Sequence, residues 1–148
     1  MKFVTMMALR CGLLCAAAPA HSQAVGPGPA PVRILIAYAS ATGHTEQMAK
    51  AVAEGAKQAG TANVTLKRVA DVSEADLLGA DAIIVGSPVY NGGMAATVKA
   101  FIDRWPFEKL HDKVGAAFVT GGGLSSGEEL AQMSILSPRA TRLCNLSD

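Results

Sequence analysis

Short apolar runs alternate with longer amphipathic segments through most of this chain. Residues 33–38, 81–86 and 113–119 are almost continuously apolar, which predicts strands buried on both faces. Residues 63–69 alternate between apolar and polar side chains, as expected for a strand at the edge of a sheet. The pattern therefore predicts four strands with helical segments between them.

Helical spacing of apolar residues places two of the expected helices. One spans residues 45–59, with Met48, Val52 and Ala56 on one face. Another ends before Pro106, which cannot continue a helix. Its apolar face consists of Met94, Val98, Phe101 and Ile102.

Capping patterns predict two further helix starts. Ser73 precedes Asp76 by three residues, and Ser126 precedes Glu129 by the same interval. A hydroxyl at the first position and an acid at the fourth satisfy each other's backbone N–H groups at a helix N-terminus. We therefore expect a short helix after Ser73 and another that runs from Ser126 to about Ile135.

This alternation of strands and helices is typical of a parallel sheet covered by helices on both faces. Ligands of such sheets bind beyond the carboxyl ends of the strands. Each buried strand is followed by a segment rich in glycine or hydroxyl residues, namely residues 40–45, 87–94 and 120–127. We expect these three segments to lie together at one edge of the sheet.

The segment over residues 40–45 has the composition of a phosphate-binding turn. It joins a strand to a helix and offers the hydroxyls of Ser40, Thr42 and Thr45, without Lys or Arg. The N–H groups of a first helical turn and the helix dipole favour an anion there. The turn has neither a Walker nor a dinucleotide glycine pattern, so it suits a monophosphate such as FMN. An ordinary turn capped by Thr42 or Thr45 is the alternative.

The N-terminal segment has the features of an export signal. Lys2 and Arg10 give it a basic start, an apolar run follows, and residues 18–20 read Ala-Pro-Ala, a pattern of cleavage sites. We assign residues 1–20 to a signal peptide and residues 21–32 to a linker. The protein is then exported, to the periplasm; it is cytoplasmic if the segment arises from a misplaced start codon.

Charge and cysteine content restrict the partners of the mature chain. Of 13 basic residues, Lys2 and Arg10 leave with the signal, so that 11 basic residues face 12 acidic ones. This balance argues against nucleic acid as a partner. The apolar run of the signal is too short for a bilayer span. Cys144 is the remaining cysteine, and no metal site is expected.

The three segments together resemble the flavodoxin-like superfamily, and most closely the tryptophan-repressor-binding-protein type of NAD(P)H:quinone oxidoreductase. The resemblance is strongest over residues 40–46, 86–94 and 99–103. It implies an α/β fold, a doubly wound parallel sheet with strand order 2-1-3-4. It also implies FMN as cofactor, NAD(P)H as co-substrate, and a quinone or another small electron acceptor as substrate.

The resemblance also implies which residues contact the cofactor, fifteen positions in three groups. The phosphate would be held by Ser40, Ala41, Thr42, Gly43, His44 and Thr45. The isoalloxazine ring would lie along Ser87, Pro88, Val89, Tyr90 and Asn91, with Tyr90 stacked on it. The polar edge of the flavin would face Thr120, Gly121, Gly122 and Gly123. No catalytic residue is assigned, because the flavin itself carries the hydride.

The sequence departs from the family pattern at its C-terminus. Residues 137–148 show neither strand alternation nor a helical face, and Pro138 interrupts the expected helix. We interpret residues 33–136 as a flavodoxin-like domain without its fifth strand and last helix, followed by an irregular tail. An uncovered sheet edge favours homo-oligomers. A flavodoxin-like electron carrier and a truncated, inactive remnant are the alternatives to a quinone reductase.

Overall fold

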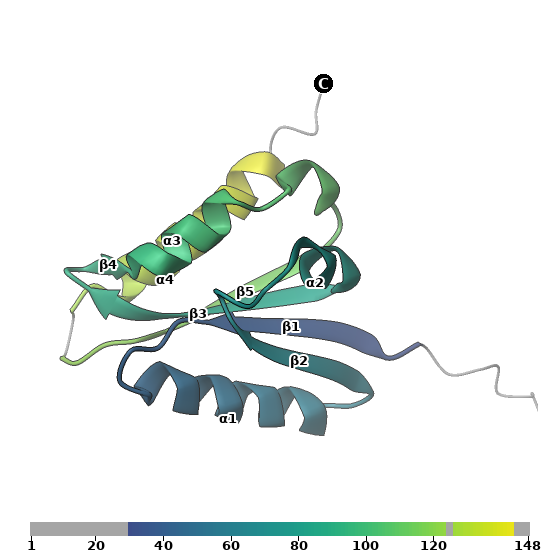
Figure 1. Ribbon diagram of the computed structural model, residues 1–148, viewed down its shortest axis with the longest axis horizontal. Helices are drawn as coiled ribbons and strands as arrows, with labels where there is room; N and C mark the ends of the chain where they lie inside the picture. Colours follow the sequence, from purple (N-terminus) through teal and green to yellow (C-terminus); the bar gives the residue numbers. More distant parts are fainter. Residues whose placement is uncertain (1–29, 124–125, 144–148) are drawn as a thin grey trace, which may run out of the picture.

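The computed structural model describes residues 30–123 and 126–143, which form one sheet with helices on both faces (Figure 1). The predicted signal peptide and most of the predicted linker therefore lie outside the described residues. The strands are β1 (Val32–Tyr38), β2 (Ala62–Arg68), β3 (Ala82–Tyr90), β4 (Gly93–Met94) and β5 (Val114–Thr120). The helices are α1 (His44–Gln58), α2 (Glu74–Gly79), α3 (Ala96–Asp103), η1 (Phe107–Lys109) and α4 (Glu128–Leu143).

The four long strands are parallel and lie in the order β2-β1-β3-β5. This confirms the predicted order 2-1-3-4, since β5 is the fourth of the predicted strands. The short β4 pairs antiparallel with the end of β3 and was not predicted. Asn91 and Gly92 connect these two strands. Both have positive φ, as two-residue hairpin turns require. The Asn-Gly pair was the sequence signal for this hairpin.

The core lies in two layers, one on each face of the sheet. Helix α1 covers one face, and α3 and α4 lie on the other (Figure 1). The larger cluster packs Val98, Phe101 and Ile102 of α3 against Leu35 and Ile83 of the sheet. These three α3 residues are nearly inaccessible to solvent, which confirms them as the inner face of that helix. The fourth predicted residue, Met94, belongs to β4 and precedes the helix.

Helix α1 packs through a face next to the predicted one: Val52 and Ala56 are half-buried, and Val52 packs against the apolar cluster, but Met48 does not. Ala49 and Ala53 are buried, together with Thr45, whereas the side chain of Met48 is 45% exposed. The small alanine side chains allow the helix to lie close to Ile36, which belongs to the same apolar cluster. The prediction was wrong because it ranked positions by hydrophobicity, whereas close packing here selects small residues.

The predicted start of α4 is one residue too early. The helix begins at Glu128, and the N–H of Ala131 donates to the carbonyl of Gly127 at 2.9 Å, so that Gly127 occupies the N-cap position instead of Ser126. Gly127 has a φ of +97°, a conformation that glycine adopts without strain. The capping box of Ser73 and Asp76, in contrast, forms as predicted at the start of α2.

The prediction of an irregular tail was wrong for residues 137–143. Helix α4 continues through Pro138 to Leu143, and residues 144–148 lie outside the described part of the chain. Proline removes one helical hydrogen bond, but it does not have to end a helix whose flanking residues favour the conformation. Ala140, Arg142 and Leu143 are such residues.

Within residues 30–123 and 126–143, the strand that pairs with β5 is β3, and no strand lies along the other edge of β5. Val114 on this strand is 68% exposed. None of the helices in the described ranges is long and apolar enough to cross a membrane.

Candidate cofactor site

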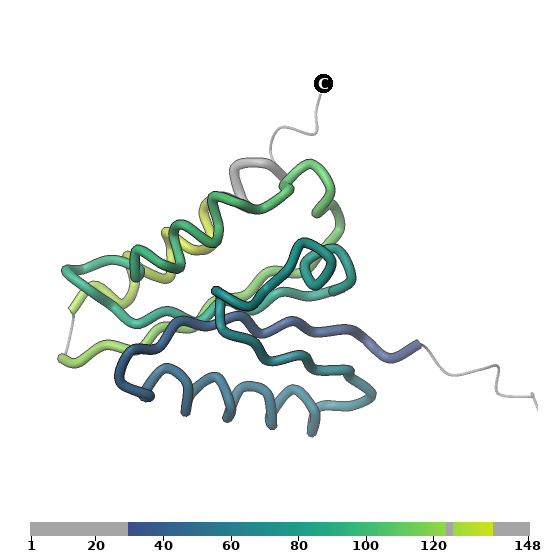
Figure 2. The backbone as a smooth tube through the Cα atoms, in the orientation of Figure 1, coloured from purple at the N-terminus to yellow at the C-terminus, as the bar shows by residue number. Residues whose placement is uncertain are grey.

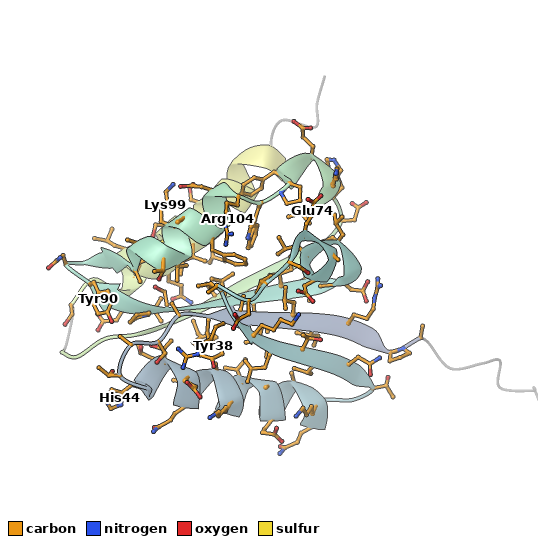
Figure 3. All side chains as sticks on the ribbon, viewed as in Figure 1. Tyr38, His44, Glu74, Tyr90, Lys99 and Arg104 are labelled. Carbon is orange, nitrogen blue, oxygen red and sulfur yellow. The ribbon has the colours of Figure 1, made fainter. Side chains whose placement is uncertain are left out.

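The segments that follow β1, β3 and β5 gather at the carboxyl end of the sheet, as the backbone trace in Figure 2 shows. We call them loop 1 (residues 39–43), loop 2 (residues 91–92) and loop 3 (residues 121–123 and 126–127). The N–H of Ala39 in loop 1 donates to the carbonyl of Gly86 at 3.0 Å, which ties this loop to β3. His44 and Tyr90 lie at this same end of the molecule (Figure 3).

Loop 1 leads into α1 without a side-chain cap. Gly43 is the N-cap, with a φ of +93°, and no side chain accepts a hydrogen bond there. The hydroxyl of Ser40 instead accepts the N–H of Gly43 at 3.1 Å. The first-turn N–H groups of α1 and the positive end of its dipole are thus left for an external anion. The alternative of a turn capped by Thr42 or Thr45 does not describe this helix start.

Thr45 links two loops and does not face solvent. Its side chain is 2% exposed, and one of the hydroxyls of Thr45 and Thr120 donates to the other across 2.8 Å. The bond joins the first turn of α1 to the end of β5. Thr42 and His44, by comparison, are exposed, and Ser40 and Gly43 are half-buried. The structure therefore gives Thr45 the role of a connection between loops 1 and 3.

Ser87 shapes the region around loop 2 from inside. Its side chain is fully buried, donates to the carbonyl of Pro88 at 2.8 Å and accepts the N–H of Ala95 at 2.9 Å. Both hydroxyl functions are thereby used in holding the β3–β4 hairpin to the start of α3. Pro88 and Val89 are half-buried, and Asn91 is exposed.

Tyr90 is the aromatic residue of this group, and it is available to a ligand. Its side chain is 50% exposed at the end of β3. An aromatic face with a polar tip suits stacking on a planar ring system.

Loop 3 brings glycine backbone against its neighbours. A Cβ atom at Gly127 would lie 2.5 Å from the Cα of Gly92, so loops 2 and 3 touch where neither has a side chain. A Cβ at Gly121 would overlap the carboxylate of Glu128. Gly122 and Gly123 are exposed. Glycine at Gly127 thus permits the close approach of loops 2 and 3. The predicted contact of residues 120–123 with the flavin edge stays a prediction.

Arg68 joins this site although its sequence position, at the end of β2, gave no indication of it. Its guanidinium donates to the carbonyl of Ser40 at 3.2 Å and to the carboxylate of Glu46 at 2.7 Å. Lys50 also bonds Glu46, at 2.9 Å. The hydrogen bond from Lys50, followed by the charges of Lys50 and Arg68, holds the pKa of Glu46 below its ordinary value.

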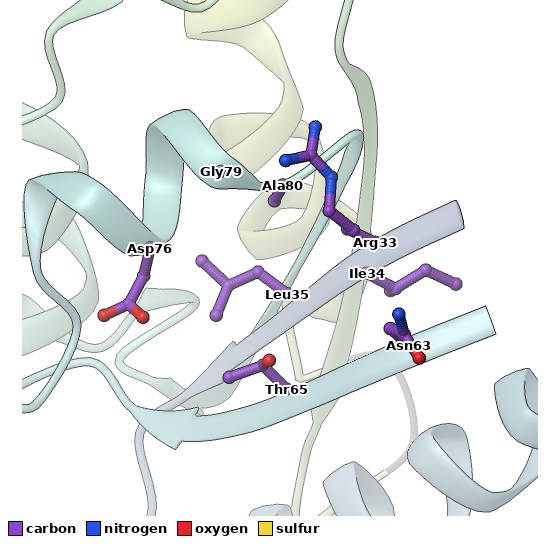
Figure 4. Close-up of a pocket in the computed structure, with 8 residues that line it drawn as sticks. All are labelled: Arg33, Ile34, Leu35, Asn63, Thr65, Asp76, Gly79 and Ala80. Carbon is purple, nitrogen blue, oxygen red and sulfur yellow. The ribbon is translucent and has the colours of Figure 1, made fainter. Parts of the chain in front are cut away.

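A hollow lies away from the three loops. It has a volume of about 390 Å³ and opens between α2 and the amino halves of β1 and β2 (Figure 4). It is lined by Arg33, Ile34, Leu35, Asn63, Thr65, Asp76, Gly79 and Ala80. None of these residues belongs to the predicted cofactor site.

Known proteins of related sequence and structure agree with this geometry. The family profile described as NADPH-dependent FMN reductase matches residues 31–140. "NAD(P)H dehydrogenase (quinone) 3" of Rhizobium meliloti is 38% identical over 126 residues, which cover 69% of this chain and 59% of that protein. "NAD(P)H dehydrogenase (quinone)" of Afipia carboxidovorans is 38% identical over 129 residues, covering 71% and 64%.

Solved structures show the same fold. A WrbA-like flavodoxin from Agrobacterium tumefaciens has a TM-score of 0.61 at 30% identity and covers 74% of this chain and 72% of its own. A flavodoxin from the domain Archaea has a TM-score of 0.61 at 26% identity, covering 74% of both chains. The chain spans about three-fifths of the length of the curated relatives it matches, 59% for the Rhizobium protein. The chain belongs to the NADPH-dependent FMN reductase family, with a flavodoxin-like fold.

Proposed function

We propose that this protein binds FMN at the edge formed by loops 1, 2 and 3, and that it reduces quinones by two electrons with NAD(P)H. Membership of the FMN reductase family supports the cofactor and the nicotinamide. The names of the Rhizobium and Afipia relatives support the quinone. The near balance of basic and acidic residues is more typical of an enzyme for small substrates than of a carrier that docks by charge.

The observation that carries the proposal is the uncapped start of α1. Gly43 leaves the first-turn N–H groups of α1 without a side-chain partner, and Ser40 orders the loop in front of them. Backbone donors with a helix dipole behind them fit a phosphate monoester, and no lysine or arginine is needed within the loop. The residues present therefore fit the phosphate end of FMN.

The elements at this edge of the sheet have separate tasks in this proposal. FMN held there would supply the hydride chemistry between the nicotinamide and the quinone. Loop 1 binds the phosphate, and the exposed ring of Tyr90 offers a face for the isoalloxazine. The hydroxyl bond between Thr45 and Thr120 holds loop 3 beside loop 1. The protein's contribution is position and electrostatics, because no side chain has to act as a nucleophile.

An electron carrier without a small substrate is the second candidate. The structural likeness to the archaeal flavodoxin favours it, since that protein is named as a flavodoxin and not as a reductase. The two candidates differ in whether nicotinamide can reduce the bound flavin. They do not differ in the fold or in the expected phosphate site.

Anaerobic mixing of the FMN-loaded chain with NADH or NADPH distinguishes the two candidates. We expect one of the nicotinamides to bleach the flavin absorbance, and benzoquinone to restore it with one quinone consumed per nicotinamide. Reduction by dithionite but by neither nicotinamide would support the carrier and refute the reductase. A Tyr90→Ala variant should slow both half-reactions while leaving the fold intact, because its side chain is half exposed.

A further inference from the structure

We propose that Arg68 is a positioning residue for the phosphate loop: it holds the Ser40–Ala41 peptide so that the Ala41 N–H faces the phosphate of FMN. The inference rests on the proposed function, because it assigns a role in binding the same cofactor. Arg68 is the last residue of β2 and lies outside loops 1, 2 and 3.

The position of Arg68 follows from strand register. Arg68 is paired with Tyr38, two residues before Ser40, so its side chain starts beside the exit of β1. The guanidinium lies over the Tyr38 ring, with its carbon 5.7 Å from the ring centroid. From there it reaches two acceptors, the carbonyl of Ser40 and the carboxylate of Glu46. A single side chain thus connects β2, loop 1 and the first turn of α1.

The bond to Ser40 fixes the direction of a backbone donor. The described chain contains no cis peptide bond, so the C=O of Ser40 and the N–H of Ala41 point in opposite directions across one rigid plane. A carbonyl held by Arg68 on the β2 side turns the Ala41 N–H to the other side. Loop 1 then presents this donor together with the first-turn N–H groups of α1.

Glu46 explains why a cation is needed at this place. Its carboxylate lies in the first turn of α1, close to where the phosphate is expected, and would repel that anion if it were unpaired. Arg68 and Lys50 both bond it, so its charge is offset by two cations. Arg68 therefore orients the peptide and compensates Glu46 at the same time, without contact to the phosphate.

Direct contact between Arg68 and the phosphate is the competing account, and the Ala41 amide in Arg68→Gln separates the two. If Arg68 acts through the loop, Arg68→Gln frees the Ser40–Ala41 peptide, and the Ala41 N–H no longer responds to FMN. If Arg68 binds the phosphate, the Ala41 N–H responds to saturating FMN in Arg68→Gln as it does in the wild type. Arg68→Lys preserves charge, but an ammonium cannot bond both acceptors in the fork geometry of arginine.

Equilibrium dialysis of the full chain against FMN and against riboflavin, which lacks the phosphate, tests the proposal. We expect Arg68→Gln to weaken FMN about tenfold while riboflavin changes little, and Arg68→Lys to fall in between. Arg33→Gln is the matched control: Arg33 forms a bond of similar geometry with Asp81 at the amino end of β1. This control should leave the affinities for both flavins unchanged.

Amide NMR gives a second measurement, which would not change if Arg68 only stabilised the fold. FMN, but not riboflavin, should shift the Ala41 amide resonance in the wild type, and the shift should be lost in Arg68→Gln. Equal FMN affinity of the wild type and Arg68→Gln, or an Ala41 shift that FMN still produces in Arg68→Gln, would overturn the inference alone. A wild-type chain that binds neither flavin would overturn the proposed function and the inference with it.

Discussion

The two ends of the sheet are built on opposite principles. At the amino end, charged side chains close the structure: Arg33 pairs with Asp81 at 2.7 Å, and Lys113 donates to the carbonyls of Leu78 and Ala80. At the carboxyl end, glycine loops meet and α1 starts without a side-chain cap. At the amino end, side-chain donors are thus paired with carboxylate and carbonyl acceptors. At the carboxyl end, the first-turn N–H groups of α1 have no side-chain acceptor.

Arg33 and Arg68 show the difference in a single residue type. Their side chains are 57% and 52% exposed, and each donates to a carboxylate at 2.7 Å. Arg33 donates a second side-chain hydrogen bond to the same Asp81, whereas Arg68 donates one to the carbonyl of Ser40. Similar arginines thus have two roles: Arg33 stabilises the strands at the amino end, and Arg68 organises loop 1 at the carboxyl end.

The largest expected effect comes from separating loops 2 and 3 with Gly127→Ala. The positive φ of Gly127 and the nearby Gly92 backbone both oppose a side chain. We expect about 1–3 kcal/mol of backbone strain, a further cost from overpacking, and loss of FMN retention. Urea unfolding and dialysis against FMN measure the two effects.

Gly55→Ala is the control for this substitution. Gly55 lies inside α1, and nothing is within 4 Å of a Cβ atom at this position. Alanine should stabilise the helix by about 0.5–1 kcal/mol and leave flavin binding unchanged. Equal unfolding midpoints for Gly127→Ala and the wild type would show that loops 2 and 3 do not depend on this close approach.

An intermediate effect is expected from the hydroxyl bond between loops 1 and 3. Thr120→Val leaves the buried hydroxyl of Thr45 without this partner, which should destabilise the protein by about 1–3 kcal/mol. The double variant with Thr45→Val should lose less than the sum of the single variants, because neither hydroxyl then remains. Additive losses in urea unfolding would mean that the two hydroxyls do not interact.

The smallest effect concerns the amino end and its dependence on pH. Hydrogen bonds from the side chain and backbone of Arg33 lower the pKa of Asp81 from 3.8 to about 2. Since the folded pKa is below the unfolded one, this stabilisation is present above pH 3.8 and is lost as the pH falls toward 2. Asp81→Asn should therefore lower the urea midpoint near neutral pH, and the difference should vanish in acid.

FMN affinity provides the contrast with the carboxyl end. Asp81→Asn should not change it, because Asp81 lies at the opposite end of the strands. A midpoint difference that persists below about pH 2 would assign the effect to packing and not to the ion pair.

The strands and the positions of the loops were predictable from local patterns, whereas the strand order was implied by the family resemblance. The continuous apolar runs identify β1, β3 and β5, and parallel strands place the following loops at one end. The inner face of α1 was not predictable from hydrophobicity, since contact distance selects Ala49 over Met48. The hydroxyl of Thr45 is not an exposed donor, because it is hydrogen-bonded to that of Thr120, which is 75 residues away in sequence. Such pairings arise only when the sheet has formed.

The contribution of Arg68 was hidden for the same reason. Loop 1 contains no basic residue, and the sequence showed no cation in its neighbourhood. The pairing of β2 with β1 places Arg68 beside the exit of β1. The register of neighbouring strands therefore contributes to this site a residue that no contiguous motif contains.

The ratio of the dissociation constants for riboflavin and FMN tests the central claim most directly. If backbone donors at the start of α1 bind the phosphate, its several charge-assisted hydrogen bonds, at about 1.5–3 kcal/mol each, should make FMN at least about 100-fold tighter. Raising the salt concentration should reduce this ratio, because part of it is electrostatic. Equal affinity for the two flavins would contradict the assignment of loop 1 as a phosphate site.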